Sequence, residues 1–305
     1  MRLPRHDQAN SQAEPAAANN SHRLPPSAAD AYLPGFEEND SLRSDFIRQL
    51  TLRQLLGSRT TSIWDEAHPT EPIPRTLVQF WHDPHDVPPD VRSCLDSWGS
   101  LRTEGFAFRM FDDESAGAYI AERYSSRHLS AFGRCRHPAM RSDYLRLCFV
   151  HAEGGLYVDA DDVLMSDGWK YIFRDHTLKV QALAYDISAG GMVPPSELRR
   201  TELPIRDRIF YVNNNPIAAP AGHPVLRRAL ARATDRLLGG EPAPDIQSTT
   251  GPGNLTAALA GHARELQMED AHSDFELLLD WERTAEPQWD LGYRNDARNW
   301  RNMDL

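Results

Sequence analysis

The sequence predicts an α/β protein with a central mixed, mostly parallel sheet flanked by helices. Short apolar segments alternate along the chain with longer segments of helical periodicity, and glycine or proline stands between them. The 305 residues, 40% hydrophobic and 25% charged, have the composition of an ordinary globular protein of one or two domains.

The predicted core begins at residue 74. Residues 76–81 (TLVQFW) are apolar and rich in β-branched and aromatic side chains, which predicts a buried first strand. Residues 106–111 (FAFRMF) alternate and predict a second strand. The next expected elements are helices over 88–98, 114–124 (capped by Asp112-Asp113) and 138–152 (ended by Gly154-Gly155), and a third strand over 156–158.

The second half is less regular. Here we expect strands over 179–185 and 209–212, a turn-rich loop over 213–220, and helices over 223–238 and 254–266. The last 25 residues contain tryptophans but little periodicity, and predict no particular element.

The N-terminal region has a different composition. Residues 1–40 are rich in Ala, Asn, Ser and Pro and lack the apolar content that would offset the entropy of ordering, so we expect a disordered tail. Residues 41–56 repeat leucine, isoleucine and phenylalanine at near-helical spacing, which predicts an amphipathic helix packed on the main domain. The predicted organisation is a tail (1–40), a helical extension and linker (41–72) and the main domain (73–305).

Charge and cysteine content exclude several classes of protein. With 33 basic and 44 acidic residues, the net charge of -11 argues against a nucleic-acid partner. The three cysteines form no CxxC pair and predict neither a disulfide framework nor a zinc site. No apolar run of signal-peptide or membrane-spanning length occurs. We therefore expect a cytoplasmic protein, with peripheral membrane contact or secretion without a signal peptide left open and the oligomeric state undetermined.

Two acids directly follow the third predicted strand. Alternate side chains of a strand share a face, so Asp159 and Asp161 should project toward the same sheet edge, where α/β proteins bind ligands. Their oxygens suit Mg²⁺ or Mn²⁺ that also contacts substrate phosphates. Asp162 should point away from Asp161, so we expect it less often as a ligand.

The helix before this strand supports a ligand site. Asp143 and Arg146 are three residues apart and share a helix face. Gly154-Gly155 permits a tight reversal into the strand, which would place this pair near the two acids. There Arg146 could bind an anionic or hydroxyl-rich ligand with two hydrogen bonds.

These motifs together resemble a known family. S-D-x-x-R over 142–146, followed by G-G-x-Y-x-D-x-D over 154–161, is similar to the glycosyltransferases with a D-x-D sugar-binding region, namely family 32 and the capsular-polysaccharide type, and more distantly the clostridial glucosylating toxins. Residues 73–82, 213–224 (NNNPIAAPAGHP) and 250–252 (TGP) resemble further segments of these proteins, so the resemblance covers most of the chain after residue 72.

The resemblance implies a GT-A fold and retaining transfer of a sugar from a nucleoside diphosphate sugar to a hydroxyl acceptor, with Mn²⁺ or Mg²⁺. A UDP-sugar is favoured and GDP-mannose is the alternative. It assigns catalytic roles to Asp143, Arg146 and Asp161. It assigns donor contacts to Phe80, Trp81, Asp143, Arg146, Tyr157, Asp159, Ala160, Asp161, Asn214, Asn215 and Trp300.

The chain departs from these relatives near its C-terminus. They often carry a histidine-containing segment that closes over the donor and can add a metal ligand, whereas residues 293–300 here read YRNDARNW. The expected metal ligands are therefore Asp159 and Asp161, with Asn295 or Asp296 as the third. The missing histidine leaves open a pseudoenzyme that binds a nucleotide sugar. A protein-modifying glycosyltransferase of the effector kind and, more weakly, a metal-dependent phosphohydrolase are further alternatives.

Overall fold

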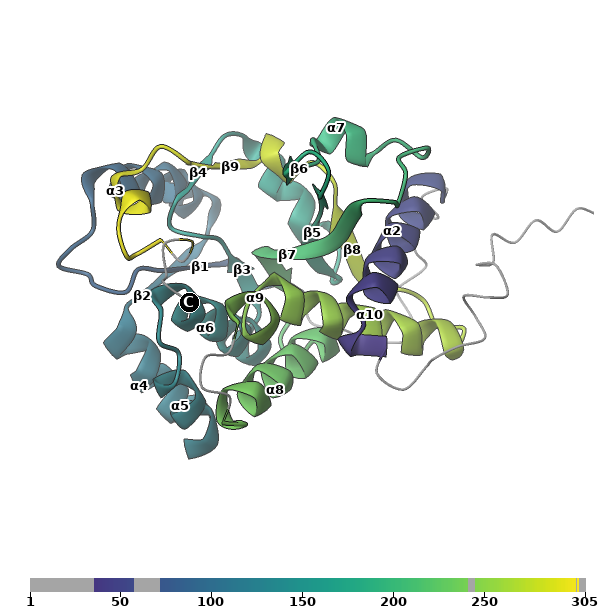
Figure 1. Cartoon of the computed structure of the whole chain (residues 1–305). Coiled ribbons are helices and arrows are strands. Elements are labelled where there is room, and N and C mark those ends of the chain that lie inside the picture. Colours follow the sequence, from purple (N-terminus) through teal and green to yellow (C-terminus); the bar gives the residue numbers. More distant parts are fainter. Residues whose placement is uncertain (1–35, 58–71, 241–244, 300, 302–305) are drawn as a thin grey trace, which may run out of the picture. The chain divides into compact units, whose positions relative to one another are not determined.

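A mixed seven-stranded sheet organises the chain (Figure 1). The computed structural model describes residues 36–57, 72–240, 245–299 and 301. The main path of the sheet has the order β2-β1-β3-β7-β5-β6, and β8 pairs with β5 beside this path. The first three strands run parallel, whereas β7 is antiparallel to both β3 and β5. The predicted α/β architecture with a mixed central sheet is confirmed.

The strands are β1 (Thr76–Phe80), β2 (Ala107–Phe111), β3 (Gly155–Tyr157), β4 (Asp162–Leu164), β5 (Leu178–Asp186), β6 (Gly191–Met192), β7 (Arg208–Ala219), β8 (Phe275–Leu278) and β9 (Ala285–Pro287). The α-helices are α2 (Asp40–Leu56), α3 (Pro89–Ser97), α4 (Asp113–Arg123), α5 (Ser126–Gly133), α6 (Pro138–Glu153), α7 (Pro195–Leu198), α8 (Pro224–Leu238), α9 (Ile246–Thr249) and α10 (Pro252–Met268). Five short 3-10 helices, η1 to η5, cover Phe36–Glu38, Trp98–Glu104, Asp167–Arg174, Trp281–Arg283 and Gly292–Asn295.

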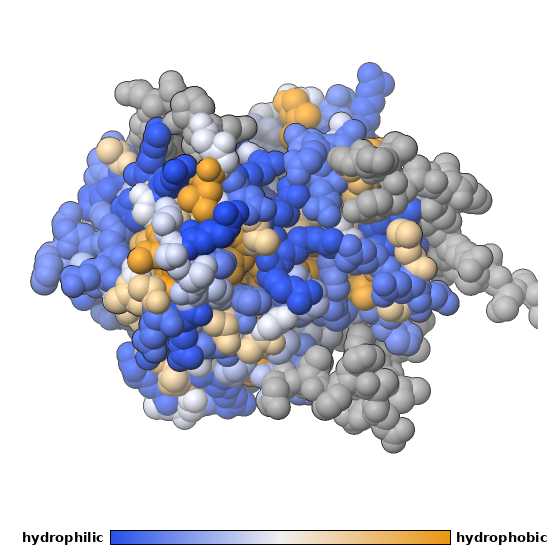
Figure 2. All heavy atoms as spheres, turned by 90° about the horizontal axis from the view of Figure 1, so that it is seen from below, coloured by the Kyte–Doolittle hydropathy of each residue, from blue (hydrophilic) through white to orange (hydrophobic). Residues whose placement is uncertain are grey.

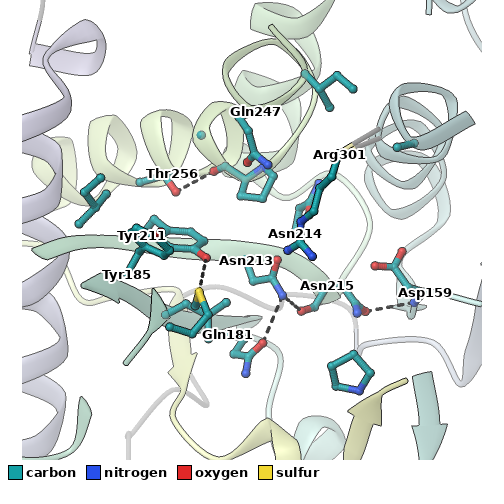
Figure 3. A pocket seen from close by; sticks show the side chains of 18 of the residues that line it. Asp159, Gln181, Tyr185, Tyr211, Asn213, Asn214, Asn215, Gln247, Thr256 and Arg301 are labelled. Atoms are coloured by element: carbon teal, nitrogen blue, oxygen red, sulfur yellow. Dashed lines mark hydrogen bonds between the residues drawn. The ribbon is translucent and has the colours of Figure 1, made fainter. Parts of the chain in front are cut away.

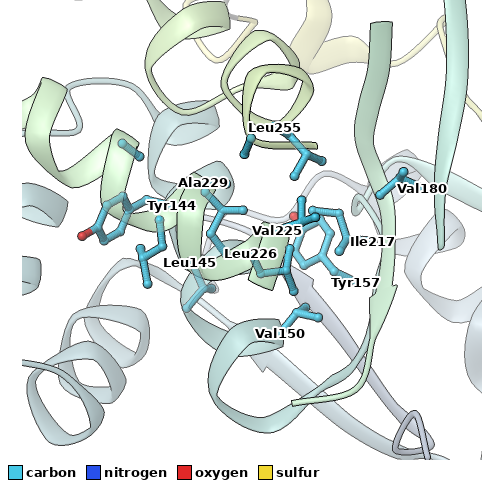
Figure 4. Close-up of a cluster of buried hydrophobic side chains, with 14 of the residues drawn as sticks. Tyr144, Leu145, Val150, Tyr157, Val180, Ile217, Val225, Leu226, Ala229 and Leu255 are labelled. Carbon is cyan, nitrogen blue, oxygen red and sulfur yellow. The ribbon is translucent and has the colours of Figure 1, made fainter. Parts of the chain in front are cut away.

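Alternating side chains of the strands build a core on each face of the sheet. Val78 and Tyr157 belong to the larger core, which lies between the sheet and helices including α6, α8 and α10 (Figure 4). Their neighbours Leu77 and Leu156 belong to the second core, on the opposite face. This period of two is the pattern of strands buried on both sides, and it explains why these short strands read as continuous apolar runs.

The helix-to-strand turn between α6 and β3 has the geometry that its two glycines predict. Gly154 has φ 71° and Gly155 has φ 116°, where residues with a side chain are strained. A Cβ on Gly154 would lie 2.8 Å from Cδ of Pro74, and one on Gly155 would lie 2.8 Å from the carbonyl oxygen of Thr76. The glycines therefore let α6 end directly against β1, which brings its side chains to the strand ends.

The predicted loop over 213–220 is wrong, because these residues continue β7 almost to their end. Val212 pairs with Ala182 and Ile217 pairs with Val180, so residues 213–216 lie opposite the single residue Gln181. This bulge redirects the asparagine side chains without ending the strand. The sequence NNNP has turn chemistry, but the pairing with β3 and β5 on either side overrides it.

The predicted N-terminal helix is confirmed as α2, and it packs against β7 and α10. Ile47 lies in the larger core. The hydroxyl of Ser44 accepts a hydrogen bond from the backbone N–H of Phe210 at 2.9 Å. On α10, the hydroxyl of Thr256 does the same for Val212 at 3.0 Å. The two hydroxyls thus satisfy backbone groups of β7 that have no neighbouring strand, which explains why a helix can cover this edge.

The elements that were not predicted include α5, α7, α9, β6, β8 and the small sheet in which β4 pairs with β9. The predicted tail falls mostly on residues 1–35, and much of the linker on 58–71, outside the described residues. The face seen in Figure 2 is mostly hydrophilic, with hydrophobic residues in small separate groups. Within the described ranges, no helix has the length and apolarity needed to span a bilayer.

Ser44→Ala should lower the free energy of unfolding by about 1–3 kcal/mol, because it leaves the buried N–H of Phe210 without an acceptor. Urea titration of the full chain measures this loss. Ser41→Ala, at an exposed position of the same helix, is the matched control and should have little effect. Equal stability of the two variants would contradict the role of Ser44.

Candidate functional site

A large cleft opens at the carboxyl ends of β1 and β3. Its volume is about 1710 Å³, more than one small ligand needs. Figure 3 shows part of its wall, where the asparagines of β7 lie between Asp159 and the tyrosines farther along the sheet. Of the predicted site residues, those that line the cleft are Phe80, Trp81, Asp143, Arg146, Asp159, Ala160, Asp161, Asn214 and Asn215.

Arg146 links the predicted motifs to one another. Its side chain is only 4% exposed, and all three guanidinium nitrogens donate hydrogen bonds inside the protein. One nitrogen bonds Oδ1 of Asp159 at 2.8 Å, and another bonds the carbonyl oxygen of Asn214 at 2.6 Å. The guanidinium also lies 4.2 Å above the ring of Tyr157. Arg146 therefore fixes the relative positions of α6, β3 and β7 at the cleft.

Asp143 is the second buried charge of this group. Its carboxylate lies 3.2 Å from Arg146, and it accepts hydrogen bonds from Nδ2 of Asn214 at 2.7 Å and from the hydroxyl of Thr250 at 3.2 Å. Burial raises the pKa of Asp143 to about 6, although Arg146 opposes this shift. The carboxylate thus joins α6, β7 and the segment before α10 at one point.

The asparagines in the bulge of β7 each contact a different part of the site. Asn214 bonds Asp143, as described. Asn215 accepts from the backbone N–H of Asp159 at 3.1 Å and donates to Oδ2 of Asp162 at 3.0 Å. It therefore holds the first and the last residue of the acidic segment, which is residues 159–162. Asn213 donates to the side chain of Gln181 at 3.3 Å, farther along the cleft (Figure 3).

Asp161 is covered by the C-terminal segment, which is residues 288–299. The hydroxyl of Tyr293 donates to Oδ2 of Asp161 at 2.5 Å, and the guanidinium of Arg294 forms an ion pair with the same oxygen. Burial and the nearby Asp159 raise the pKa of Asp161, and Arg294 acts in the opposite direction. This carboxylate therefore already has a cationic partner.

Asp162, the acid expected to point away, is buried and accepts from Asn215 through Oδ2. Its other oxygen, Oδ1, is buried and accepts no hydrogen bond of ordinary geometry, and the indole N–H of Trp281 lies close to this carboxyl group. Four carboxyl groups face two guanidinium groups, those of Arg146 and Arg294, in this part of the cleft. If all four ionise, two negative charges are in excess. The four acids are Asp143, Asp159, Asp161 and Asp162. An excess of two negative charges and a group of carboxylate oxygens suit one divalent cation.

The residues that the structure describes include no group of three or more His, Cys, Asp or Glu side chains placed to hold a metal by themselves. Asn295 and Asp296 are exposed and do not line the cleft, and the carboxylate of Asp296 pairs with Arg298. A divalent cation would therefore need oxygens from a ligand or water, as Mg²⁺ commonly does. The predicted third ligand has no support from these positions.

The predicted aromatic contacts are placed differently from one another. Trp81 is 7% exposed and meets the ring of Tyr293 edge-on at 5.2 Å, so its face is largely covered in this conformation. Phe80 and Ala160 are buried at the cleft wall, and Tyr157 lies behind it, where its hydroxyl donates to Asp159 at 3.1 Å. Trp300 lies outside the described residues.

Tyr293, Arg294 and Thr250 reach the site but were not predicted to do so. The prediction for residues 293–300 concerned oxygen donors that could replace a histidine as a metal ligand, and an arginine is not such a donor. Thr250 lies in the TGP segment noted for its resemblance, yet no sequence signal places its hydroxyl on Asp143. These contacts join segments more than 100 residues apart.

The arrangement defines an α/β protein with a cleft at the carboxyl ends of its parallel strands, where carboxylate and amide groups gather in one part of the wall. No protein-family profile matches the chain. Over 105 residues, or 32% of this chain, it is 25% identical to the initiation-specific alpha-1,6-mannosyltransferase of Saccharomyces cerevisiae. The match spans only 22% of that protein. Among solved structures it is similar to the PaToxG glycosyltransferase, with a TM-score of 0.45 and 16% identity, over 76% of this chain and 82% of that one.

Asp162→Asn should stabilise the protein at pH 7 in the presence of EDTA. Burial, with Asp161 and Asp159 nearby, raises the pKa of Asp162 well above its ordinary value. The folded protein thus holds this proton more tightly than the unfolded chain, so folding stability falls as the pH rises above about 4. Asparagine removes this loss and keeps an oxygen for Asn215.

Urea titrations between pH 4 and pH 7 measure the effect. The advantage of Asp162→Asn over the wild type should be largest at pH 7 and shrink toward pH 4. Asp167→Asn, at a side chain that is 77% exposed, is the control and should show no such trend. A variant less stable than the wild type at pH 7 would contradict the prediction.

Proposed function

We propose that the protein is a metal-dependent, retaining glycosyltransferase of the GT-A type, which moves a sugar from a nucleoside diphosphate sugar to a hydroxyl acceptor. The observation that carries the proposal is the network in which Arg146 joins Asp143 to Asp159, next to Asp161. The sequence similarity to a mannosyltransferase, which covers 32% of the chain, supports the same chemistry.

The donor would lie over the acidic segment and β7. Asp159 keeps a 32% exposed side chain, although Arg146 and Tyr157 fix one of its oxygens, so it can offer a preoriented acceptor to donor hydroxyls. Asn214 and Asp143 face the same part of the cleft. Because Arg146 is buried and already hydrogen-bonded, we assign it the role of a positioning residue that fixes these groups, rather than a direct sugar ligand.

The acceptor would approach from the other half of the cleft. Beyond Asn213 its wall includes Gln181 of β5 and Tyr211 of β7, whose strands pair antiparallel (Figure 3). Glu282 also lines this half, and its Oε1 accepts from Nε2 of Gln181 at 2.6 Å. Amide and carboxylate groups here could orient an acceptor hydroxyl. We nominate no catalytic base, because retaining relatives are usually proposed to transfer the acceptor proton to the leaving phosphate.

Bound Mn²⁺ or Mg²⁺ would stabilise the negative charge that develops on the leaving diphosphate. Asp161 and Asp159 are the residues of this chain that would hold the cation. The remaining contribution of the protein is to fix the sugar and acceptor in position and to exclude water as the C-terminal segment covers the donor.

A donor screen tests the proposal. The full chain is incubated with Mn²⁺ and UDP-glucose, UDP-galactose, UDP-N-acetylglucosamine or GDP-mannose, and release of the nucleoside diphosphate is measured with and without EDTA. We expect hydrolysis of at least one donor, abolished by EDTA. Asp161→Ala should lose roughly 100-fold or more of this activity while keeping the wild-type circular dichroism spectrum.

Asp207→Asn is the matched control, because Asp207 lines the far half of the same cleft and should not affect hydrolysis. Full activity of Asp161→Ala would overturn the proposed role of the acidic segment. Thermal stabilisation by a donor and Mn²⁺ without any product would favour the second candidate, a nucleotide-sugar-binding pseudoenzyme. The ion pair that Arg294 already forms with Asp161 is the observation that keeps this candidate in view.

A further inference from the structure

The side chain of Arg294 is held over the acidic segment by contacts with three residues. Its guanidinium contacts Oδ2 of Asp161, and its Nε donates to the carbonyl oxygen of Gln288 at 2.8 Å. The same guanidinium lies 4.4 Å from the ring centre of Trp289. With a side chain that is 15% exposed, Arg294 faces the cleft and is held on three sides by its own segment and by Asp161.

The pairing of β9 with β4 holds the backbone before Arg294 in position. In the β4–β9 pair, Asp162 lies opposite Pro287, and the backbone N–H of Gln288 donates to the carbonyl oxygen of Asp161 at 2.9 Å. The backbone that precedes Arg294 is therefore hydrogen-bonded to the acidic segment itself. The long side chain of Arg294 can move while this backbone stays in place.

Arg294 and a divalent cation would compete for the same carboxylate. Both need the oxygens of Asp161, and two positive groups on one carboxylate that is only 14% exposed repel each other because water screens them poorly. A guanidinium released from Asp161 would find the nearest new anion in the donor diphosphate, whose oxygens match its planar donors.

We propose that Arg294 is an exchangeable counter-ion, which neutralises Asp161 in the empty cleft and passes to the donor diphosphate when a divalent cation binds Asp161. The inference rests on the proposed function for the identity of the diphosphate. It makes Arg294 a donor-binding residue at the place where relatives carry a histidine. It also makes the cation and the nucleotide bind cooperatively. The diphosphate gives the displaced Arg294 a new anionic partner, and the cation releases Arg294 from Asp161 so that it can bind the diphosphate.

Isothermal titration of the full chain with MnCl₂, alone and with saturating UDP or GDP, tests this exchange. Arg294→Gln should bind Mn²⁺ alone roughly 10-fold more tightly than the wild type, because the competing cation is gone. The nucleotide should increase Mn²⁺ affinity at least roughly 10-fold in the wild type and much less in Arg294→Gln. A residue with only a structural role would weaken Mn²⁺ binding or leave it unchanged when replaced.

Arg206→Gln is the matched control. Arg206 lines the same cleft and pairs with Asp207 rather than Asp161, so this variant removes one positive charge without touching the acid. It should leave Mn²⁺ affinity close to the wild-type value. If Arg294→Gln does not fold, Trp289→Leu removes the ring under the guanidinium at a side chain that is 58% exposed, and should also strengthen Mn²⁺ binding without nucleotide.

The outcomes separate this inference from the proposed function. Equal Mn²⁺ affinity of the wild type and Arg294→Gln, without nucleotide, would overturn the exchange even if the donor screen succeeds. Tighter Mn²⁺ binding by Arg294→Gln, together with no binding of UDP or GDP by the wild type in the presence of Mn²⁺, would support the competition at Asp161. The same result would overturn the transfer of Arg294 to a diphosphate and the proposed function with it.

Discussion

The buried guanidinium of Arg146 is the interaction on which the rest of the site depends. A charge that is 4% exposed is stable only if every donor is satisfied, and here the partners come from three different elements. Ser142 lies on its own helix, Asp159 follows β3, and the carbonyl oxygen of Asn214 belongs to the bulge of β7. Meeting the needs of one arginine therefore fixes the relative positions of the three segments that form the cleft.

This dependence explains two irregular features of the fold. The glycine pair after α6 allows the helix to end against β1, close enough for Arg146 to reach Asp159. The bulge of β7 places four residues opposite one, which lets Asn214 and Asn215 turn toward the acids. Regular pairing would send alternate asparagines to the opposite face, into the apolar core. The irregular backbone is thus a requirement of the polar site.

The acids of the site outnumber the arginines that contact them. Burial raises the pKa of Asp143, Asp161 and Asp162, and the arginines in contact with these acids number fewer than the acids themselves. Such an excess of buried negative charge is unfavourable for folding and favourable for binding a cation. The arginine of the C-terminal segment reduces this excess in the empty cleft, which connects the absence of a histidine in that segment to the electrostatics of the site.

Elements whose signals are local could be predicted from the sequence. The periodicity of α6, the cap at Asp112, the glycine turn and the strand before Asp159 all follow from neighbouring residues. The spacing of Asp143, Arg146, Asp159 and Asp161 was sufficient to predict that they lie together.

Tertiary structure alone decided the rest, because its causes are distant in sequence. The NNNP segment reads as a turn until β3 and β5 pair beside it. Likewise, nothing near residue 294 indicates that its arginine meets Asp161, since the contact depends on β9 pairing with β4. Local propensity and spacing therefore identified the acids, whereas long-range strand pairing and the need to neutralise buried charge decided their partners.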